Sequence, residues 1–309
     1  DLLAQGLLAQ GKAFSRSAFC GRICAPSATA IRCTMPRLQI SFRQNPFRQS
    51  PCLLIACLLL MLIRPAFAWQ DDARISQLFA AEKLRGTFVL YDVASGTLSG
   101  HDATRANTRF IPASTFKIPN TLIGLTTGAV KSVDEILPYG GQPQPYPQWE
   151  KDMNLRDAIK VSNVPVYQEL ARRTGMQRMQ ENMARLHYGN GETGSVVDRF
   201  WLDGPLQISA VEQVQFLAQL AQGKLPFPKE AQDGVRDITL LEKNERWTLH
   251  GKTGWGTATK PGIGWWVGWV EKQGRIYAFA LNIDMQSAED APKRMALAKA
   301  SLAASGILD

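Results

Sequence analysis

The most chemically informative stretch of the sequence is Ser114-Thr115-Phe116-Lys117, a serine followed three residues later by a lysine. Positions three apart lie on the same face of a helix, so the amine of Lys117 can reach the hydroxyl of Ser114. A serine hydroxyl is a weak nucleophile until a neighbouring base removes its proton, and a neutral lysine can be that base. Apolar neighbours such as Phe116 and Ile118 would favour the neutral amine. The spacing therefore indicates a Ser-Lys catalytic pair, although alone it also fits a helix surface with a solvated lysine.

Three later stretches can supply partners for this pair. Ser162-Asn163-Val164 falls at the end of a predicted helix, where a serine hydroxyl can relay a proton. Tyr188-Gly189-Asn190 marks a tight turn. His250-Gly251-Lys252-Thr253-Gly254 begins in a predicted strand, and its glycines would let a substrate backbone lie alongside. Each stretch has a simpler structural explanation, but their joint order after the Ser-x-x-Lys helix favours one catalytic site.

Two other kinds of hydrolytic site fit the sequence less well. The histidines are His101, His187 and His250, and no Gly-x-Ser-x-Gly elbow surrounds Ser114, so a Ser-His-Asp hydrolase is not favoured. Scattered histidines, without a cysteine after residue 68, do not make a metal-ligand set. We therefore expect neither a metal nor a nucleotide cofactor.

The first 68 residues differ in composition from the rest of the chain. All five cysteines lie there, and so do eight Lys/Arg residues against one acidic residue. The remainder is close to neutral, so the net charge of +8 does not indicate nucleic-acid binding. The same remainder contains no cysteine for a disulfide framework.

Residues 35–68 have the features of a secretory signal peptide. A positive start is followed by an apolar run at 51–63, which is shorter than the roughly 20 residues needed to cross a bilayer. Ala66-Phe67-Ala68 is a small-x-small cleavage signal, so we expect cleavage after Ala68, a periplasmic protein and no stable membrane span after removal. Residues 1–34 are expected to be an upstream or over-called segment. A retained anchor or lipid attachment at Cys57 is disfavoured because the apolar run continues past that cysteine.

Residues 69–309 are expected to form a single catalytic domain of the α+β class. Helix start and stop signals and alternating apolar residues define the predicted elements. We predict helices at 72–82, 114–126, 155–161, 166–174, 177–186, 209–222 and 291–304, strands at 86–93, 97–98, 247–252, 264–272 and 275–284, and a loop at 138–148. Strands near both ends and helices between them imply an antiparallel sheet built from both termini, flanked by helices, with a central helical insert. A small ligand would bind in a cleft between the sheet and this insert.

Taken together, the four motif stretches resemble the serine penicillin-recognising enzymes, specifically the class D β-lactamases (oxacillinases). The resemblance covers 69–309 and extends to Phe-Trp-Leu-Asp-Gly-Pro-Leu at 200–206 and Trp-Trp-Val-Gly-Trp-Val at 265–270. Class A enzymes would carry Ser-Asp-Asn as the second element, where this chain has Ser162-Asn163-Val164. The resemblance implies the serine β-lactamase/D,D-peptidase-like fold, hydrolysis of penicillins and related β-lactams through an acyl-serine intermediate, and β-lactam resistance.

The resemblance also implies a role for each matching catalytic residue. Ser114 would be the nucleophile, and Lys117, carboxylated on its amine by carbon dioxide, would be the general base. Ser162 would relay the proton to the leaving nitrogen, with Lys252 as a nearby positive charge. No other cofactor is implied.

Supporting and substrate-binding roles follow from the same resemblance. Trp201 would donate its indole N–H to the carbamate, and Val164 would help to keep the pocket dry. Backbone N–H groups of Ser114 and Trp255 would form an oxyanion hole. The residues expected to bind substrate are Tyr188, Asn190, Thr253, Gly254 and, for the substrate carboxylate, Arg294.

Two alternatives remain open at this point. A penicillin-sensor domain would be acylated without turnover, and a D,D-peptidase would deacylate slowly. A sensor would need a spanning helix and a cytoplasmic partner domain, and a peptidase commonly carries Ser-x-Asn in place of Ser162-Asn163-Val164. The expected partner is a small β-lactam, and the choice between monomer and homodimer is left open.

Overall fold

The structure of the protein is a computed structural model, and it describes residues 69–308. The predicted upstream segment at 1–34 and the predicted signal peptide at 35–68 lie outside the described residues, so these assignments stay predictions. The strands of the described part are β1 (Trp69–Asp71), β2 (Gly86–Asp92), β3 (Thr97–His101), β4 (Leu240–Lys243), β5 (Trp247–Gly256), β6 (Gly262–Lys272) and β7 (Arg275–Met285).

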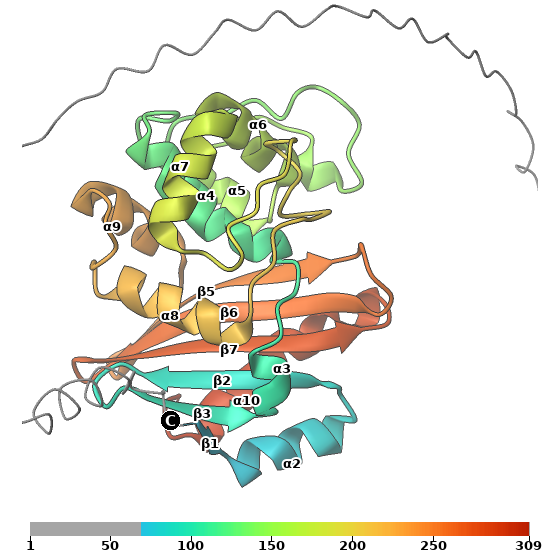
Figure 1. The fold of residues 1–309 in the computed structure, drawn as a ribbon, viewed down its shortest axis with the longest axis vertical. Helices are drawn as coiled ribbons and strands as arrows, with labels where there is room; N and C mark the ends of the chain where they lie inside the picture. Colours follow the sequence, from blue (N-terminus) through green and yellow to red (C-terminus); the bar gives the residue numbers. More distant parts are fainter. Residues whose placement is uncertain (1–68, 309) are drawn as a thin grey trace, which may run out of the picture. The chain divides into compact units, whose positions relative to one another are not determined.

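The helices of the described part lie mostly between β3 and β4 in the sequence (Figure 1). The α-helices are α2 (Ala73–Glu82), α3 (Ala103–Ala106), α4 (Lys117–Thr126), α5 (Leu155–Lys160), α6 (Val164–Thr174), α7 (Met176–Leu186), α8 (Ala210–Ala221), α9 (Lys229–Ile238) and α10 (Ala291–Ala304). The 3-10 turns are η2 (Ala113–Phe116), η3 (Pro147–Trp149) and η4 (Ala288–Asp290).

The strands of residues 69–308 form one seven-stranded sheet in the order β1-β3-β2-β7-β6-β5-β4. The pairs are antiparallel except for the short parallel pair of β1 with β3. Strands from the two ends of the described part pair where β2 meets β7, with Gly86 opposite Ile283 and Asp92 opposite Tyr277. The prediction of an antiparallel sheet built from both termini with a helical insert is confirmed.

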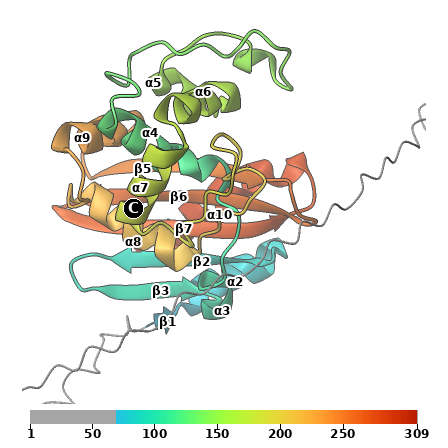
Figure 2. The same ribbon diagram turned by 45° about the horizontal axis from the view of Figure 1, so that its top comes forward.

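Each face of the sheet packs against different helices, because successive side chains of a strand point to opposite faces. Val267 and Trp269 belong to the core that includes residues of α8, whereas Trp266 and Val270 belong to the core under α2 and α10. Helices α4–α7 and α9 lie beyond the β5 side of the sheet, and the short α3 lies near β2 (Figures 1 and 2). Apolar side chains of α5 and α6 form a further core around Tyr167, whereas the buried apolar side chains of α4 and α7 belong to the core that includes α8. The helical insert therefore lies beside the strand that carries the Lys-Thr-Gly sequence.

The predicted helix at 114–126 begins differently from the expectation. Its first turn, η2, is a 3-10 turn, and the α-helix begins only at Lys117. A 3-10 turn has three residues per turn, so side chains three apart are eclipsed and lie even closer than in an α-helix. The face shared by Ser114 and Lys117 is therefore preserved.

The sequence analysis did not predict helix α9 or strand β4. Gly234 lowers the helix propensity of 229–238, but a Cβ built on it would lie 3.3 Å from Leu125 Cδ1 and 3.4 Å from Val133 Cγ1. The glycine therefore allows α9 to pack closely against the end of α4. Every residue of β4 is exposed, so the alternation that identifies a strand is absent there. Among the helices of residues 69–308, none is long and apolar enough to cross a bilayer.

Candidate active site

The turn η2 directs its side chains in three directions. Ser114 lies on the cavity side, above Lys117 at the start of α4. Thr115 points into the core towards α8, where its hydroxyl accepts a hydrogen bond from Gln213 Nε2 at 2.9 Å. Phe116 packs in an aromatic cluster, stacked on Trp201 with ring centres 5.2 Å apart. Each face of this turn is therefore held by a different part of the chain.

The amine of Lys117 is the buried partner of the Ser114 hydroxyl. Its Nζ atom donates a hydrogen bond to Ser114 Oγ over 2.9 Å, and the side chain is 0% exposed. Burial, and then the positive charge of Lys252, hold the pKa of Lys117 well below its usual range. The nearby ring of Tyr167, with its centre 5.2 Å from Nζ, adds no formal charge. This environment favours a neutral amine that can accept a proton.

Lys252 is a second buried lysine in the same region. It lies in β5 and is 5% exposed, and burial followed by the charge of Arg294 lowers its pKa to about 7. Its Nζ atom donates to the backbone oxygen of Thr253 at 3.0 Å and to Thr253 Oγ1 at 3.3 Å. The side chain can therefore hold or release a proton near neutral pH.

The edge of β5 is open beside the nucleophile. The N–H of Gly251 donates to Thr239 O at 2.9 Å, on the side where β4 pairs with β5. Because strand residues alternate, the N–H groups of Thr253 and Trp255 point to the same edge, beyond the end of β4. A ligand amide can thus pair with this edge, and the Trp255 N–H can face a developing oxyanion.

Gly254 lets this edge approach η2 closely. A Cβ built on Gly254 would lie 3.0 Å from both Pro112 O and Thr115 Cγ2, closer than ordinary packing allows. The absence of a side chain at 254 therefore sets the distance between the nucleophile turn and β5. This is the physical reason for glycine in the Lys-Thr-Gly sequence.

A cavity of about 510 Å³ opens at Ser114. Seven of the predicted site residues line it. They are Ser114, Ser162, Val164, Thr253, Gly254, Trp255 and Arg294. The described part of the chain thus brings together residues from η2, the α5–α6 junction, β5 and α10.

Local backbone geometry places Ser162 at the cavity. Its φ of 56° is in the left-handed region, so the chain turns sharply between α5 and α6. The side chain of the next residue, Asn163, accepts a hydrogen bond from Val166 N at 3.0 Å and caps α6. Val164, the first residue of α6, then lies at the cavity wall.

Comparisons with known proteins agree with this geometry. Residues 86–303 match the model of the penicillin binding protein transpeptidase domain family. The chain is similar to β-lactamase OXA-5 of Pseudomonas aeruginosa, with 44% identity over 233 residues, 74% of this chain and 87% of the relative. It is also similar to β-lactamase OXA-48 of Klebsiella pneumoniae, with 40% identity, 76% of this chain and 89% of the relative. Among solved structures it matches FUS-1 (OXA-85), a class D β-lactamase from Fusobacterium nucleatum subsp. polymorphum, with 48% identity and a TM-score of 0.76 over 78% of this chain and 100% of that chain.

The chain belongs to the class D β-lactamases. The predicted family, its α+β fold and its assignment as a serine β-lactamase are thereby confirmed. The roles of individual residues are separate questions, which depend on where each side chain lies.

Trp201 of this class D β-lactamase lies against the nucleophile turn. Its side chain is 1% exposed, and its backbone oxygen accepts a hydrogen bond from Ala113 N at 3.0 Å. Within residues 69–308, no side-chain hydrogen bond of its indole N–H is found. A donor is therefore free next to the turn that carries Ser114 and Lys117.

Tyr188 and Asn190, which were predicted to bind substrate, belong to a turn held mainly by contacts within the protein. Tyr188 is 1% exposed and packs edge-on against Phe116, with ring centres 5.9 Å apart, behind the nucleophile turn. Asn190 donates to Pro205 O at 2.9 Å and accepts from Gln207 N at 3.0 Å. Neither residue lines the cavity at Ser114. A tight-turn motif gives no indication of which side faces a ligand, and here the turn holds the segment after Trp201 in place.

Arg294 reaches the cavity from α10. Its Nη1 atom donates to Gly254 O at 2.6 Å and its Nε atom to Ala291 O at 2.9 Å. Burial lowers the pKa of its guanidinium, which nevertheless stays charged at neutral pH. The side chain is therefore a fixed positive charge at the end of β5, suited to a carboxylate.

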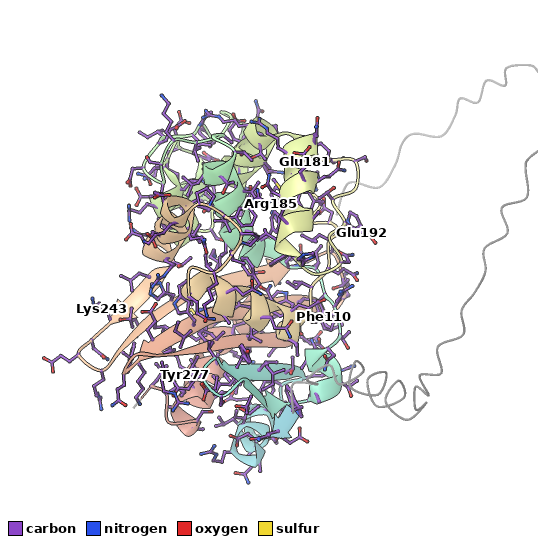
Figure 3. The ribbon with its side chains drawn as sticks, turned by 60° about the vertical axis from the view of Figure 1, so that its left-hand side comes forward. Phe110, Glu181, Arg185, Glu192, Lys243 and Tyr277 are labelled. Carbon is purple, nitrogen blue, oxygen red and sulfur yellow. The ribbon has the colours of Figure 1, made fainter. Side chains whose placement is uncertain are left out.

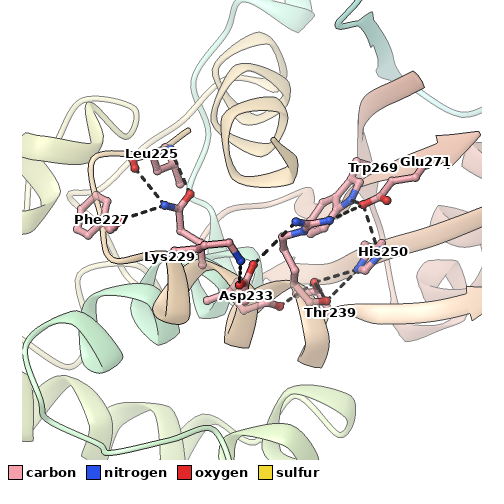
Figure 4. A network of polar contacts seen from close by, with 11 residues as sticks. Leu225, Phe227, Lys229, Asp233, Thr239, His250, Trp269 and Glu271 are labelled. Atoms are coloured by element: carbon pink, nitrogen blue, oxygen red, sulfur yellow. Dashed lines mark hydrogen bonds and ion pairs between the residues drawn. The ribbon is translucent and has the colours of Figure 1, made fainter. Parts of the chain in front are cut away.

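The side chain of His250 is held by contacts within the protein. Its Nδ1 atom lies 2.9 Å from Arg236 O, and its ring stacks on Trp269 at 4.4 Å. Figure 4 shows it in a polar network with Thr239 and Glu271. Residues 69–308 contain no group of three or more His, Cys, Asp or Glu side chains placed to hold a metal ion.

Sequence reasoning missed two aromatic residues of the cavity wall. Tyr146 lines the cavity from segment 138–148, which was predicted only as a loop, and Trp149 lines it from directly after that segment. The indole N–H of Trp149 donates to Val161 O at 2.9 Å, directly before Ser162. Their aromatic character within a polar loop was the only signal in the sequence.

Proposed function

We propose that this class D β-lactamase hydrolyses penicillins and related β-lactams through an acyl-serine intermediate on Ser114, and thereby confers β-lactam resistance. The observation that carries the proposal is the contact of 2.9 Å between Ser114 Oγ and the fully buried Nζ of Lys117. A neutral base in hydrogen-bond contact is what a serine nucleophile requires. The β-lactamases similar to this chain support the same reaction.

We further propose that carbon dioxide carboxylates the amine of Lys117. The residues fit such a group, because only a neutral, desolvated amine adds carbon dioxide, and burial favours that form of Lys117. The free indole N–H of Trp201 can donate to a carbamate oxygen, and Val164 forms an apolar part of the cavity wall. The carbamate would supply a base for both acylation and deacylation.

Acylation then follows from the positions of the side chains. As Ser114 Oγ attacks the lactam carbonyl carbon, its proton passes to the side chain of Lys117 and the C–O bond forms. The N–H groups of Ser114 and Trp255 receive the oxyanion, an interaction whose loss typically slows a reaction by ~10²–10³. The lactam C–N bond breaks, and Ser162 relays the proton from the side chain of Lys117 to the nitrogen, so the base at position 117 is free again. Lys252 would supply a positive charge near Lys117 during this transfer.

Deacylation uses the same groups. A water molecule, activated at position 117, attacks the ester carbonyl, the C–O bond to Ser114 breaks, and the proton returns to Oγ. Arg294 would hold the substrate carboxylate, and the edge of β5 at Thr253 and Gly254 would hold the substrate amide. The products are the ring-opened acid and free enzyme, so atoms and protons balance.

The decisive experiment measures turnover of a chromogenic cephalosporin by the purified protein and by Ser114→Ala. We expect many turnovers by the wild type, none by the variant, and a mass increase of one substrate on Ser114 after rapid acid quench. A single stoichiometric burst would favour a penicillin sensor. Release of D-alanine from a D-Ala-D-Ala peptide with slow β-lactam turnover would favour a D,D-peptidase.

We also propose that residues 35–68 act as a signal peptide and that the enzyme works in the periplasm. This proposal is supported by the charged start, the short apolar run and the Ala-Phe-Ala sequence ending at Ala68. Amino-terminal sequencing of protein from a periplasmic extract should begin at Trp69. A start inside the apolar run, with the activity in the membrane fraction, would contradict it.

A further inference from the structure

A buried polar chain lies behind the nucleophile turn and takes no part in the chemistry described above. Gln213 of α8 donates from Nε2 to Thr115 Oγ1 at 2.9 Å, and Thr115 Oγ1 donates to Pro112 O at 2.8 Å. Both side chains are buried. Because the Thr115 hydroxyl has one hydrogen and directs it to Pro112, its oxygen can only accept from Gln213. The hydrogen bonds therefore run from Gln213 to Thr115 and from Thr115 to Pro112, so position 213 must carry a donor.

The first turn of α8 also holds the segment that leads to the nucleophile. The backbones of Phe110 and Ile208 exchange two hydrogen bonds, at 2.9 and 2.8 Å. Glu212, fixed by the capping box with Ser209, accepts both a 3.0 Å hydrogen bond from Nε and a second one from Nη2 of Arg109. In Figure 3, Phe110 lies at the opposite end of the sheet from Lys243 of β4. The start of α8 thus anchors the segment before Ser114, and Gln213 anchors the turn itself.

Thr115 lies between this anchor and the edge of β5. Its Cγ2 atom would be 3.0 Å from a Cβ built on Gly254, so the two backbones are in close contact through this side chain. A shift of Thr115 would move η2 relative to β5. Such a shift would change the distance between the Ser114 and Trp255 N–H groups. Displacements of about 1 Å can cost an enzyme about 10²-fold in rate.

We propose that Gln213 is a positioning residue of the active site, which acts through Thr115 to fix Ser114 relative to Lys117 and to the oxyanion-binding N–H of Trp255. This inference rests on the function proposed above. It predicts that a hydrogen-bond donor at position 213 is needed for acylation and that the need disappears when Thr115 has no hydroxyl.

A matched control replaces a different buried glutamine. Gln232 of α9 is 1% exposed, accepts a hydrogen bond from Leu225 N at 3.1 Å and donates one to Phe227 O at 2.9 Å. It does not line the cavity at Ser114. Gln232→Met therefore removes a buried amide by the same substitution and leaves the hydrogen bonds of Thr115 in place.

The test compares kcat/KM for a chromogenic cephalosporin between pH 5 and 9. The unbranched side chain of Gln213→Met fills similar space without a donor and should lower kcat/KM about 10- to 100-fold with little change in melting temperature. Gln213→Glu should match the wild type while its buried carboxyl is protonated and can donate, and fall to the level of Gln213→Met above its apparent pKa. Thr115→Ser and Gln232→Met should stay near the wild type.

The double variant decides whether Gln213 acts through Thr115. Thr115→Val should lower kcat/KM to a similar extent, and adding Gln213→Met should cause no further loss. Wild-type activity of Gln213→Met, or an equal loss in the Thr115→Val background, would overturn the proposal. If Gln213→Met does not fold, the pH profile of Gln213→Glu alone decides, and a flat profile far below the wild type would overturn it. Absence of turnover by the wild type would instead refute the proposed function, and labelling of Ser114 with a fluorescent penicillin would still report the positioning effect.

Discussion

At the scale of single residues, the site depends on the charge state of Lys117. A lysine in water is protonated at neutral pH and cannot accept a proton from serine. Here complete burial and the nearby charge of Lys252 both disfavour the ammonium form. Burial and the charge of Lys252 both lower the pKa of Lys117. The neutral amine therefore follows from the packing around η2 and α4 and from the position of Lys252.

The role of Trp201 can be separated from its packing. Trp201→Phe keeps an aromatic ring against Phe116 but removes the indole N–H. We expect near-normal acylation and a deacylation rate about 10- to 100-fold lower, since a hydrogen bond to a charged group contributes ~1.5–3 kcal/mol. Stopped-flow kinetics should show an initial burst followed by a slow steady state. Unchanged steady-state kinetics would exclude the proposed contact.

Arg294 provides a second test at this scale. Arg294→Ala should raise KM about 10-fold for a substrate with a free carboxylate, because a fixed positive charge at the cavity is lost. The esterified form of the same substrate should bind the two proteins equally. A KM change of the same size for the ester would show that the effect comes from the lost support of Gly254 O rather than from charge.

At the scale of elements, the geometry of the active site depends on the distance between η2 and β5. Gly254→Ala would place a methyl group 3.0 Å from Pro112 O and from Thr115 Cγ2, so one element must move. We expect a loss of about 1–3 kcal/mol in the free energy of unfolding and a lower kcat. Urea denaturation and steady-state kinetics check both effects. Gly274→Ala is the control for glycine replacement in general, because no atom lies within 4 Å of the new Cβ at this turn. Its φ of 75° adds local strain, but we expect no change in kcat.

The elements also show which parts of the site could be predicted from the sequence. Ser114 and Lys117 are three residues apart, so any helical turn brings them together, and the local spacing was sufficient. Gln213 and Thr115 are 98 residues apart, and no local pattern indicates their contact. The burial of Tyr188 against Phe116 could not be predicted for a related reason, because a turn sequence does not show which neighbours will cover it. Helix α9 was missed because Gly234 serves packing against another helix rather than helix formation.

At the scale of the whole molecule, the buried lysines make stability depend on pH. The folded-state pKa of Lys252 is about 7, below the unfolded value, so the unfolded chain binds more protons between these values. Stability should therefore rise with pH from about 7 towards 10, by up to about 1.4 kcal/mol per pH unit. Urea denaturation of wild type and Lys252→Met between pH 7.5 and 9.5 should show a smaller slope for the variant. The exposed Lys260→Met is the control, and equal slopes in all three proteins would contradict the account.

The most direct test of the account is carbon-13 NMR of the protein in labelled bicarbonate, recorded together with cephalosporin turnover as the pH is lowered. We expect one carbamate resonance that is absent from Lys117→Ala, and we expect its intensity and the turnover rate to fall together and to recover together when bicarbonate is added. Full turnover by a wild-type protein that shows no carbamate resonance would contradict the proposed base.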